Sequence, residues 1–205
     1  MIAKHYTNYF NGRAIDPATD ILVTNGAIGA IFSIIVNMCG KGDKVHMFEP
    51  SYSQYINIIE FSGADCDSSP MYTNEQGEWF FDFDHLEKQL DENSKLLMIT
   101  NPHNPSGKLF TEEDIVRLTA ILDKWPQVTV LSDEVYWNLP FDGRKMISFA
   151  NHCQRNWDKT INVFSAGKML NCTGWKIGFA VGPAPLINQS FFTHEASVYC
   201  NNVPG

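Results

Sequence analysis

Two lysines lie close together in the segment VFSAGKMLNCTGWKIGFAVG, which spans residues 163–182. Lys168 and Lys176 are eight residues apart, and both stand among small and apolar neighbours just after an apolar run. A lysine amine forms a Schiff base with an aldehyde, and burial or a nearby positive charge makes that amine more reactive by lowering its pKa. The pattern favours Lys168 as a nucleophile and Lys176 as the second charge or a phosphate contact. The alternative interpretation is a pair of ordinary surface lysines.

Four further polar or aromatic residues stand after other apolar runs. Asp133 ends one such run, where an unpaired carboxylate is costly, so a cation such as a protonated pyridine nitrogen would suit it. Asn104 and Tyr136 are candidates for a ring oxygen, and Tyr52 is a candidate for stacking on a ring. The alternatives are a helix cap or ion pair for Asp133, an Asx turn for Asn104, and plain packing for the tyrosines.

A possible anion site begins at a glycine turn. Gly26, Ala27 and Ile28 open a predicted helix directly after an apolar run, so their backbone N–H groups and the helix dipole favour a phosphate there. Ser165 is a second candidate donor to phosphate, or else the cap of the next helix. A glycine turn that merely starts a helix is the alternative, since the full G-x-G-x-x-G fingerprint is absent.

Pyridoxal 5′-phosphate has one chemical group for each of these candidates. It carries an aldehyde for a lysine, a ring nitrogen for an aspartate, a ring hydroxyl for an amide or phenol, a face for stacking, and a phosphate. The sequence therefore predicts this cofactor. No metal is expected, because the five cysteines are scattered and form no C-x-x-C pair.

The elements that must position these residues alternate along the chain. Short apolar runs predict strands at 21–24, 44–48, 95–100, 128–132, 160–164 and 177–181, and longer patterns predict helices at 26–38, 52–61, 83–90 and 111–125. This alternation, with apolar strands, predicts an α/β fold: a three-layer α/β/α domain with a mainly parallel sheet covered on both faces. Ligands of such sheets gather at the carboxyl ends of the strands, where the candidates stand.

Composition sets limits on location and partners. A chain of 205 residues that is 44% hydrophobic can form one domain with a proper core. The net charge of −8 argues against nucleic acid or an anionic membrane as partner. The longest apolar run is too short and too interrupted to span a bilayer, and there is no secretory signal. We expect a cytoplasmic protein, with a mitochondrial location left open.

Three motifs resemble those of a known family. NPHNPSGK, SDEVY and SAGKMLNCTGWKIG are similar, in order and spacing, to the motifs of class I/II aminotransferases of the fold-type I pyridoxal-phosphate family. The resemblance covers essentially the whole chain. It is strongest to the group of kynurenine aminotransferases, glutamine transaminase K and cysteine-S-conjugate β-lyases. It implies the family's large catalytic domain, a homodimer, and an amino acid and a 2-oxo acid as substrates.

The resemblance also implies a role for each candidate residue. Lys168 would be the Schiff-base lysine and proton shuttle, and Asp133 the partner of the pyridinium nitrogen. Tyr136 and Asn104 would hold the ring hydroxyl, and Tyr52 would stack on the ring. The phosphate would be held by Ser165, Lys176 and the amides of Gly26 and Ala27.

Several alternatives stay open. Family members are longer, so residues 1–205 are expected to be the large domain without the N-terminal arm and the small C-terminal domain, which supplies the arginine for the substrate carboxylate. A β-lyase activity would use the same cofactor residues, and the missing arginine leaves open a cofactor-binding module without full activity. A nicotinamide-binding domain is suggested by the turn at 26–29. This turn lacks the third glycine of the fingerprint, and His46 stands at the position where the ribose-binding acid is expected. Asp43 and Glu49 lie nearby in the sequence and keep this alternative open.

Overall fold

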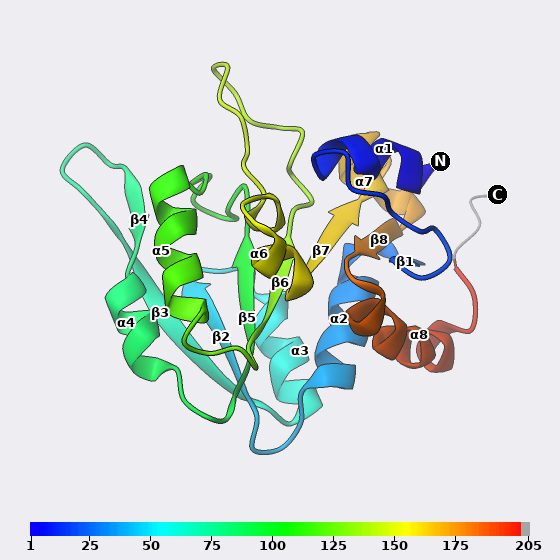
Figure 1. The fold of residues 1–205 in the computed structure, drawn as a ribbon, viewed down its shortest axis with the longest axis horizontal. Coiled ribbons are helices and arrows are strands. Elements are labelled where there is room, and N and C mark those ends of the chain that lie inside the picture. Colours follow the sequence, from blue (N-terminus) through cyan, green and yellow to red (C-terminus); the bar gives the residue numbers. More distant parts are fainter. Residues whose placement is uncertain (202–205) are drawn as a thin grey trace.

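The apolar runs assemble into one eight-stranded sheet in the computed structural model, which describes residues 1–201 (Figure 1). The remaining residues of the expected domain, 202–205, lie outside the described residues. The order across the sheet is β1-β8-β7-β6-β5-β2-β3-β4. The strands are β1 (Ile21–Asn25), β2 (Lys44–Glu49), β3 (Asp65–Thr73), β4 (Trp79–Phe81), β5 (Ser94–Thr100), β6 (Thr129–Asp133), β7 (Thr160–Ser165) and β8 (Ile177–Val181).

Strand direction brings the candidate residues to one edge of this sheet. The central strands β3, β2, β5, β6 and β7 are mutually parallel, whereas β8 is antiparallel to both of its neighbours, β7 and β1. Two reversals leave β1 running in the same direction as β7. The carboxyl ends of β1, β5, β6 and β7 therefore share an edge with the amino end of β8, where Lys176 stands.

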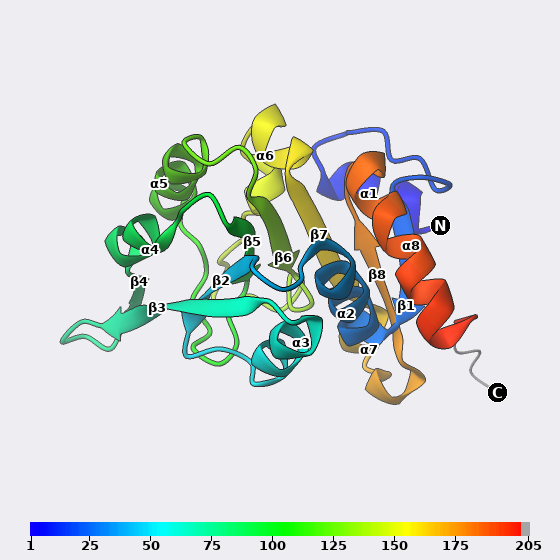
Figure 2. The same cartoon turned by 90° about the horizontal axis from the view of Figure 1, so that it is seen from below.

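Helices cover both faces of the sheet, as Figure 2 shows, with α2 and α3 on one side and α4, α5 and α6 on the other. The predicted three-layer α/β/α architecture with a mainly parallel sheet is confirmed. The helices are α1 (Ile2–Tyr9), α2 (Gly26–Met38), α3 (Gln54–Ser62), α4 (Phe83–Gln89), α5 (Glu112–Leu122), α6 (Gln154–Asp158), α7 (Ala166–Met169) and α8 (Ala184–Val198), with short 3₁₀ turns at Phe149–Asn151 and Thr173–Trp175. None of the helices within residues 1–201 is long and apolar enough to cross a lipid bilayer.

The core divides by face because successive side chains of a strand point to opposite sides. Leu131 of β6 packs in the cluster under α2 and α3, whereas its neighbour Val130 packs in the cluster under α4 and α5. A third cluster joins Phe164 and Phe179 of the antiparallel part of the sheet to Tyr6 of α1. The same alternation separates Asp133 from the next residue, Glu134, and this governs the chemistry described below.

The six predicted strands and four predicted helices are all present, with small shifts at their ends. The strands β3 and β4 and the helices α1, α6, α7 and α8 were not predicted. The segment of β3 is rich in polar residues and contains Pro70, and β4 has only three residues, so neither shows the apolar run that indicates a strand. Helix α3 begins at Gln54 rather than at Tyr52, which leaves Tyr52 in the loop that follows β2.

Candidate cofactor site at the carboxyl edge of the sheet

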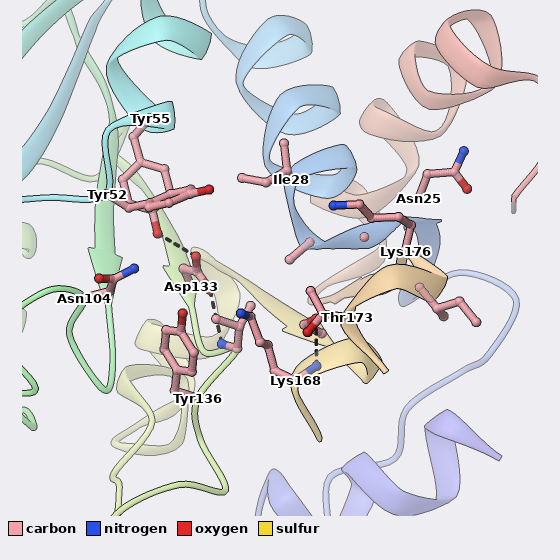
Figure 3. A pocket seen from close by; sticks show the side chains of 15 residues that line it. Asn25, Ile28, Tyr52, Tyr55, Asn104, Asp133, Tyr136, Lys168, Thr173 and Lys176 are labelled. Carbon is pink, nitrogen blue, oxygen red and sulfur yellow. Dashed lines mark hydrogen bonds between the residues drawn. The ribbon is translucent and has the colours of Figure 1, made fainter. Parts of the chain in front are cut away.

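A cavity of about 200 Å³ opens at the shared edge of the sheet (Figure 3). Five segments that are distant in sequence meet there: the start of α2, the start of α3, the turn after β5, the end of β6, and the segment from β7 to β8. All the residues predicted as a site line this cavity, namely Gly26, Ala27, Ile28, Tyr52, Asn104, Asp133, Tyr136, Ser165, Lys168 and Lys176. The fold thus brings the whole predicted set together.

Asp133 forms the floor of the cavity and is only 5% exposed. Its Oδ2 accepts a hydrogen bond of 2.6 Å from the Tyr55 hydroxyl, and its Oδ1 accepts one of 3.2 Å from the Val135 N–H. Burial raises the pKa of Asp133 to about 6, although both hydrogen bonds act in the opposite direction. Within residues 1–201 no cation pairs with this carboxylate, so its surroundings fit a cationic group of a ligand.

Lys168 is the third residue of the short helix α7, whose start is capped by Ser165: the Ser165 hydroxyl oxygen accepts the Lys168 N–H at 3.3 Å. The Lys168 ammonium lies 5.6 Å from the centre of the Tyr136 ring. In Figure 3 its side chain points into the space between Tyr136 and Asp133. No carboxylate of the described chain forms an ion pair with Lys168, and its amine is open to an aldehyde.

Neither lysine is buried, although both stand among small and apolar residues in the sequence. Lys168 and Lys176 are both exposed, because α7 and the turn Thr173–Trp175 project beyond the edge of the sheet. Only the floor of the cavity, with Asp133 and Tyr55, is covered by strands and helices. The apolar neighbours in the sequence belong to the strands on either side and to α7, and they do not enclose the two amines.

The start of α2 forms the opposite wall of the cavity. Asn25 makes no side-chain cap hydrogen bond to this helix of 13 residues, so its first N–H groups have no cap of that kind. Gly26 has φ +74°, a backbone conformation that favours glycine, and the stem of Lys176 runs alongside it. A helix start beside a lysine supplies N–H donors, a positive dipole end and a cation, which together suit a phosphate.

The remaining predicted residues stand on the side facing the helix start. The ring of Tyr52 meets that of Tyr55 edge-on, with ring centres 5.4 Å apart. Burial raises the pKa of Tyr136 above its ordinary value, as does the negative charge of Asp133. Asn104 lies in the turn after β5, where the Gly107 N–H donates to the His103 carbonyl at 2.8 Å and holds the turn closed.

Sequence reasoning missed other residues of this cavity, chiefly Tyr55 and Thr173, and a glycine that shapes it. Tyr55 lies three residues after Tyr52, the spacing at which helical side chains meet, and this signal could have found it. Gly178 of β8 touches the start of α2, since a Cβ there would lie 2.3 Å from the Ala27 nitrogen. A glycine inside a strand is a known sign of such close backbone approach.

Glu134 follows Asp133 but points to the other face of the sheet. Its carboxylate accepts hydrogen bonds from the hydroxyls of Tyr9 (2.8 Å), Ser132 (2.9 Å) and Ser148 (2.7 Å). It is fully buried, and burial raises its pKa from an ordinary value of 4.5 to about 7. Glu134 therefore ties α1 and the segment before α6 to β6, without lining the cavity.

A pH dependence of stability follows from Glu134. Because the folded protein holds this proton more tightly than the unfolded chain does, the free energy of unfolding should fall as pH rises from about 4.5 to about 7, by about 3 kcal/mol for this group. Glu134→Gln keeps hydrogen-bonding capacity and removes the titrating carboxyl group. The free energy of unfolding of this variant should therefore fall less over the same pH range than that of the unchanged protein. Urea unfolding of both proteins between pH 4.5 and 8 measures this. Equal declines would show that Glu134 does not titrate in this range.

The acids invoked for a nicotinamide site lie elsewhere. His46 is buried in β2 and hydrogen-bonds Ser94 at the amino end of β5, and the Asp43 carboxylate accepts the Gly40 N–H before β2. Glu49 accepts a hydrogen bond from the hydroxyl of Ser68 in β3. Neither the His46 imidazole nor the carboxylates of Asp43 and Glu49 line the cavity beside α2.

Comparison with known proteins agrees with this geometry. The family model "Aminotransferase class I and II" matches residues 2–201. Kynurenine–oxoglutarate transaminase of Dictyostelium discoideum is 32% identical, over 95% of this chain and 47% of that protein. Among solved structures, Escherichia coli YbdL, described with a methionine aminotransferase function, superposes with a TM-score of 0.91 at 29% identity, over 98% of this chain and 52% of that one. N-succinyldiaminopimelate aminotransferase from Mycobacterium tuberculosis superposes with a TM-score of 0.90 at 32% identity, over 97% of this chain and 50% of that one.

The chain spans about half the length of the curated relatives and solved structures that it matches. Within that half, the match runs through nearly all the described residues and includes every segment that lines the cavity. The chain belongs to the class I and II aminotransferase family.

Proposed function

We propose that this chain binds pyridoxal 5′-phosphate in the cavity beside α2 and serves the transfer of an amino group from an amino acid to a 2-oxo acid. Lys168 is the amine that binds the cofactor's aldehyde covalently. One observation carries the proposal: a lysine and a buried carboxylate that have no ion-pair partner within residues 1–201 meet in one cavity with a helix start that has a lysine beside it. Only the buried carboxylate is costly by itself, but one ligand with an aldehyde, a cationic ring nitrogen and a phosphate suits all three features.

Different residues of the cavity would hold different parts of the cofactor. Asp133 would hold the ring nitrogen, Asn104 and Tyr136 the ring hydroxyl, and Tyr52 one face of the ring. The phosphate would be held by Ser165, Lys176 and the helix start formed by Gly26, Ala27 and Ile28. When bound, the cofactor withdraws electrons from the bond between the substrate α-carbon and its hydrogen.

Two residues of the chain then do the chemical work. Lys168 Nζ would accept the proton from the substrate α-carbon, because its side chain lies beside the Tyr136 ring in the cavity and forms no ion pair within residues 1–201. The carboxylate of Asp133, at the floor of the cavity, would stabilise positive charge on the ring nitrogen.

We propose amino acids of the kynurenine or glutamine type as donors. The name of the Dictyostelium relative supports this choice, and the motif Gly174–Trp175–Lys176 resembles that of the kynurenine aminotransferase group. The same residues would serve a β-lyase reaction on a cysteine S-conjugate, in which a leaving group departs from the β-carbon. Comparing kynurenine with such a conjugate as substrate separates the two activities.

The organisation of the protein is part of the proposal. We propose that residues 1–205 are the large, cofactor-binding domain of the family, and that the protein works as a homodimer. The partial exposure of Ile28 and Tyr52 at the mouth of the cavity supports a second surface that covers them. The five cysteines carry free thiols, which supports a reducing compartment such as the cytoplasm.

A second candidate function is cofactor binding without complete turnover. It is favoured by the positions of the arginines, because no arginine within residues 1–201 lines the cavity. Arg117 and Arg155 pair with Asp84 and Asp123 on the surface, and Arg13 lies over the Trp157 ring. Within this cavity an amino-acid carboxylate would thus lack the bidentate arginine that suits it, and Arg144 lines an adjoining cavity that shares Asn104 and Tyr136. Measured transamination at a rate comparable to that of longer relatives would contradict this candidate.

The test of the main proposal is covalent trapping of the cofactor. The purified chain is mixed with pyridoxal 5′-phosphate, its visible absorption is recorded, and borohydride reduction is followed by peptide mapping. We expect a new absorption band and a single stable adduct on Lys168. Labelling of many lysines, or of none at residues 163–182, would contradict the assignment.

A further inference from the structure

Asp133 has one hydrogen-bond partner from a different layer of the molecule, the hydroxyl of Tyr55. Tyr55 is the second residue of α3, is 2% exposed, and reaches from the helix to the end of β6 (Figure 3). Its hydroxyl lies 2.6 Å from Asp133 Oδ2 and 3.2 Å from Thr100 Oγ1. This hydrogen bond connects helix α3 to the Asp133 carboxylate at the floor of the cavity.

The direction of these hydrogen bonds follows from counting protons. Thr100 and Asp133 are directly paired residues of the parallel strands β5 and β6, so their side chains lie on the same face, under α3. Tyr55 has one hydroxyl proton and the carboxylate can only accept when ionised, so Tyr55 donates to Asp133. Thr100 must then donate to the Tyr55 oxygen. The two hydroxyls form a chain that ends on the carboxylate.

Tyr55 remains a donor at every pH the protein meets. Its burial and the negative charge of Asp133 raise the pKa of Tyr55 far above the usual value for a tyrosine. Its ring also has little space in which to turn. The cavity behind it, bordered by Ser51, Thr100 and His103, has a volume of about 10 Å³, room for one water at most.

We propose that Tyr55 is a positioning residue, whose hydroxyl keeps Asp133 ionised and in place at the floor of the cavity, where it would pair with the ring nitrogen of the cofactor. This inference rests on the proposed function, because the cation that Asp133 meets there is that nitrogen. A donated hydrogen bond favours the charged form of a carboxylate, whereas burial disfavours it. Without the hydroxyl, burial acts unopposed on Oδ2, and Asp133 takes up a proton at a higher pH.

The first measurement is the titration of Asp133 itself, by NMR of the full chain with ¹³C-labelled aspartate, before cofactor is added. Tyr55→Phe keeps the ring that packs against Tyr52 and removes only the hydroxyl. We expect its Asp133 midpoint to rise by about one to two pH units, the effect of one hydrogen bond to a charged group. Thr100→Val should shift it in the same direction by less. Tyr72→Phe makes the same chemical change on the exposed side of β3 and should shift nothing.

The second measurement is the affinity for pyridoxal 5′-phosphate as a function of pH. Near pH 7, Tyr55→Phe should bind the cofactor roughly tenfold more weakly, and raising the pH by one to two units should restore binding. A residue with only a structural role would weaken binding equally at all pH values. Urea unfolding of each variant shows whether it is folded.

The outcomes separate this inference from the proposed function. If unmodified protein traps the cofactor on Lys168 but Tyr55→Phe changes neither the Asp133 midpoint nor the pH dependence of binding, the role of Tyr55 is overturned. If the midpoint shifts as expected but unmodified protein binds no cofactor, Tyr55 does control Asp133 and the proposed function fails. If Tyr55→Phe is unfolded, Thr100→Val decides by the same two measurements.

Discussion

The Lys168→Ala protein should bind pyridoxal 5′-phosphate only noncovalently, so that all of the cofactor can be removed after borohydride treatment. Without the amine, no covalent linkage to the aldehyde forms at this position, and no group moves the α-proton. Loss of proton transfer alone lowers a reaction rate by roughly 10²–10⁴-fold, and loss of the covalent linkage adds to it. The measurements are the reduced peptide map and the rate of amino transfer from kynurenine or glutamine to a 2-oxo acid.

Lys176 and Lys88 provide matched controls for this result. Lys176→Ala removes a cation from the phosphate end, so it should weaken cofactor binding while the adduct on Lys168 still forms. Lys88→Ala, in the last turn of α4, lies away from the cavity and should behave like the unchanged protein. An adduct of normal yield on a different lysine in Lys168→Ala would show that Lys168 is not the reactive amine.

Gly178→Ala should damage the cavity and the fold together. The added Cβ would lie 2.3 Å from both the Ala27 nitrogen and the Gly26 carbonyl carbon, and 2.8 Å from the Gly26 oxygen. These are backbone atoms, so no side chain can turn aside, and β8 and α2 must separate. Overpacking of this kind costs about 1–3 kcal/mol, occasionally more. Urea unfolding should show this loss, and affinity for inorganic phosphate and for the cofactor should fall because the first N–H groups of α2 are displaced.

Gly174→Ala is the control for this prediction. It lies four residues earlier in the turn Thr173–Trp175, and an added Cβ there has no neighbour within 4 Å. It should leave the free energy of unfolding and cofactor affinity close to those of the unchanged protein. A Gly178→Ala protein that is as stable as Gly174→Ala, and binds phosphate equally well, would show that β8 does not need to approach α2 so closely.

Much of the candidate site could be predicted from the sequence because it depends on local order. In a mainly parallel sheet, whatever follows each strand lies at one edge, so locating strand ends was enough to group Asn104, Asp133 and Ser165. Apolar runs and helical periodicity located those ends to within a residue or so. The chemical types of the residues then selected one cofactor.

Other features depended on contacts between segments that the sequence pattern does not reveal. Lys176 precedes a strand and nevertheless lies at the same edge, because β8 runs antiparallel to β7 and β1. The exposure of Lys168 depends on how far α7 projects beyond the sheet. Tyr55 became part of the site only through the packing of α3 over β5 and β6.

The sequence by itself thus determined the alternation of strands and helices, the chemical groups at the strand ends and the family motifs, since all of these follow from short-range patterns along the chain. Only the tertiary structure decided which side chains meet Asp133, that Glu134 serves the opposite face, and that Gly178 must lack a side chain. Those facts arise from the pairing of distant segments at van der Waals distance, where one strand direction or one methyl group changes which atoms touch.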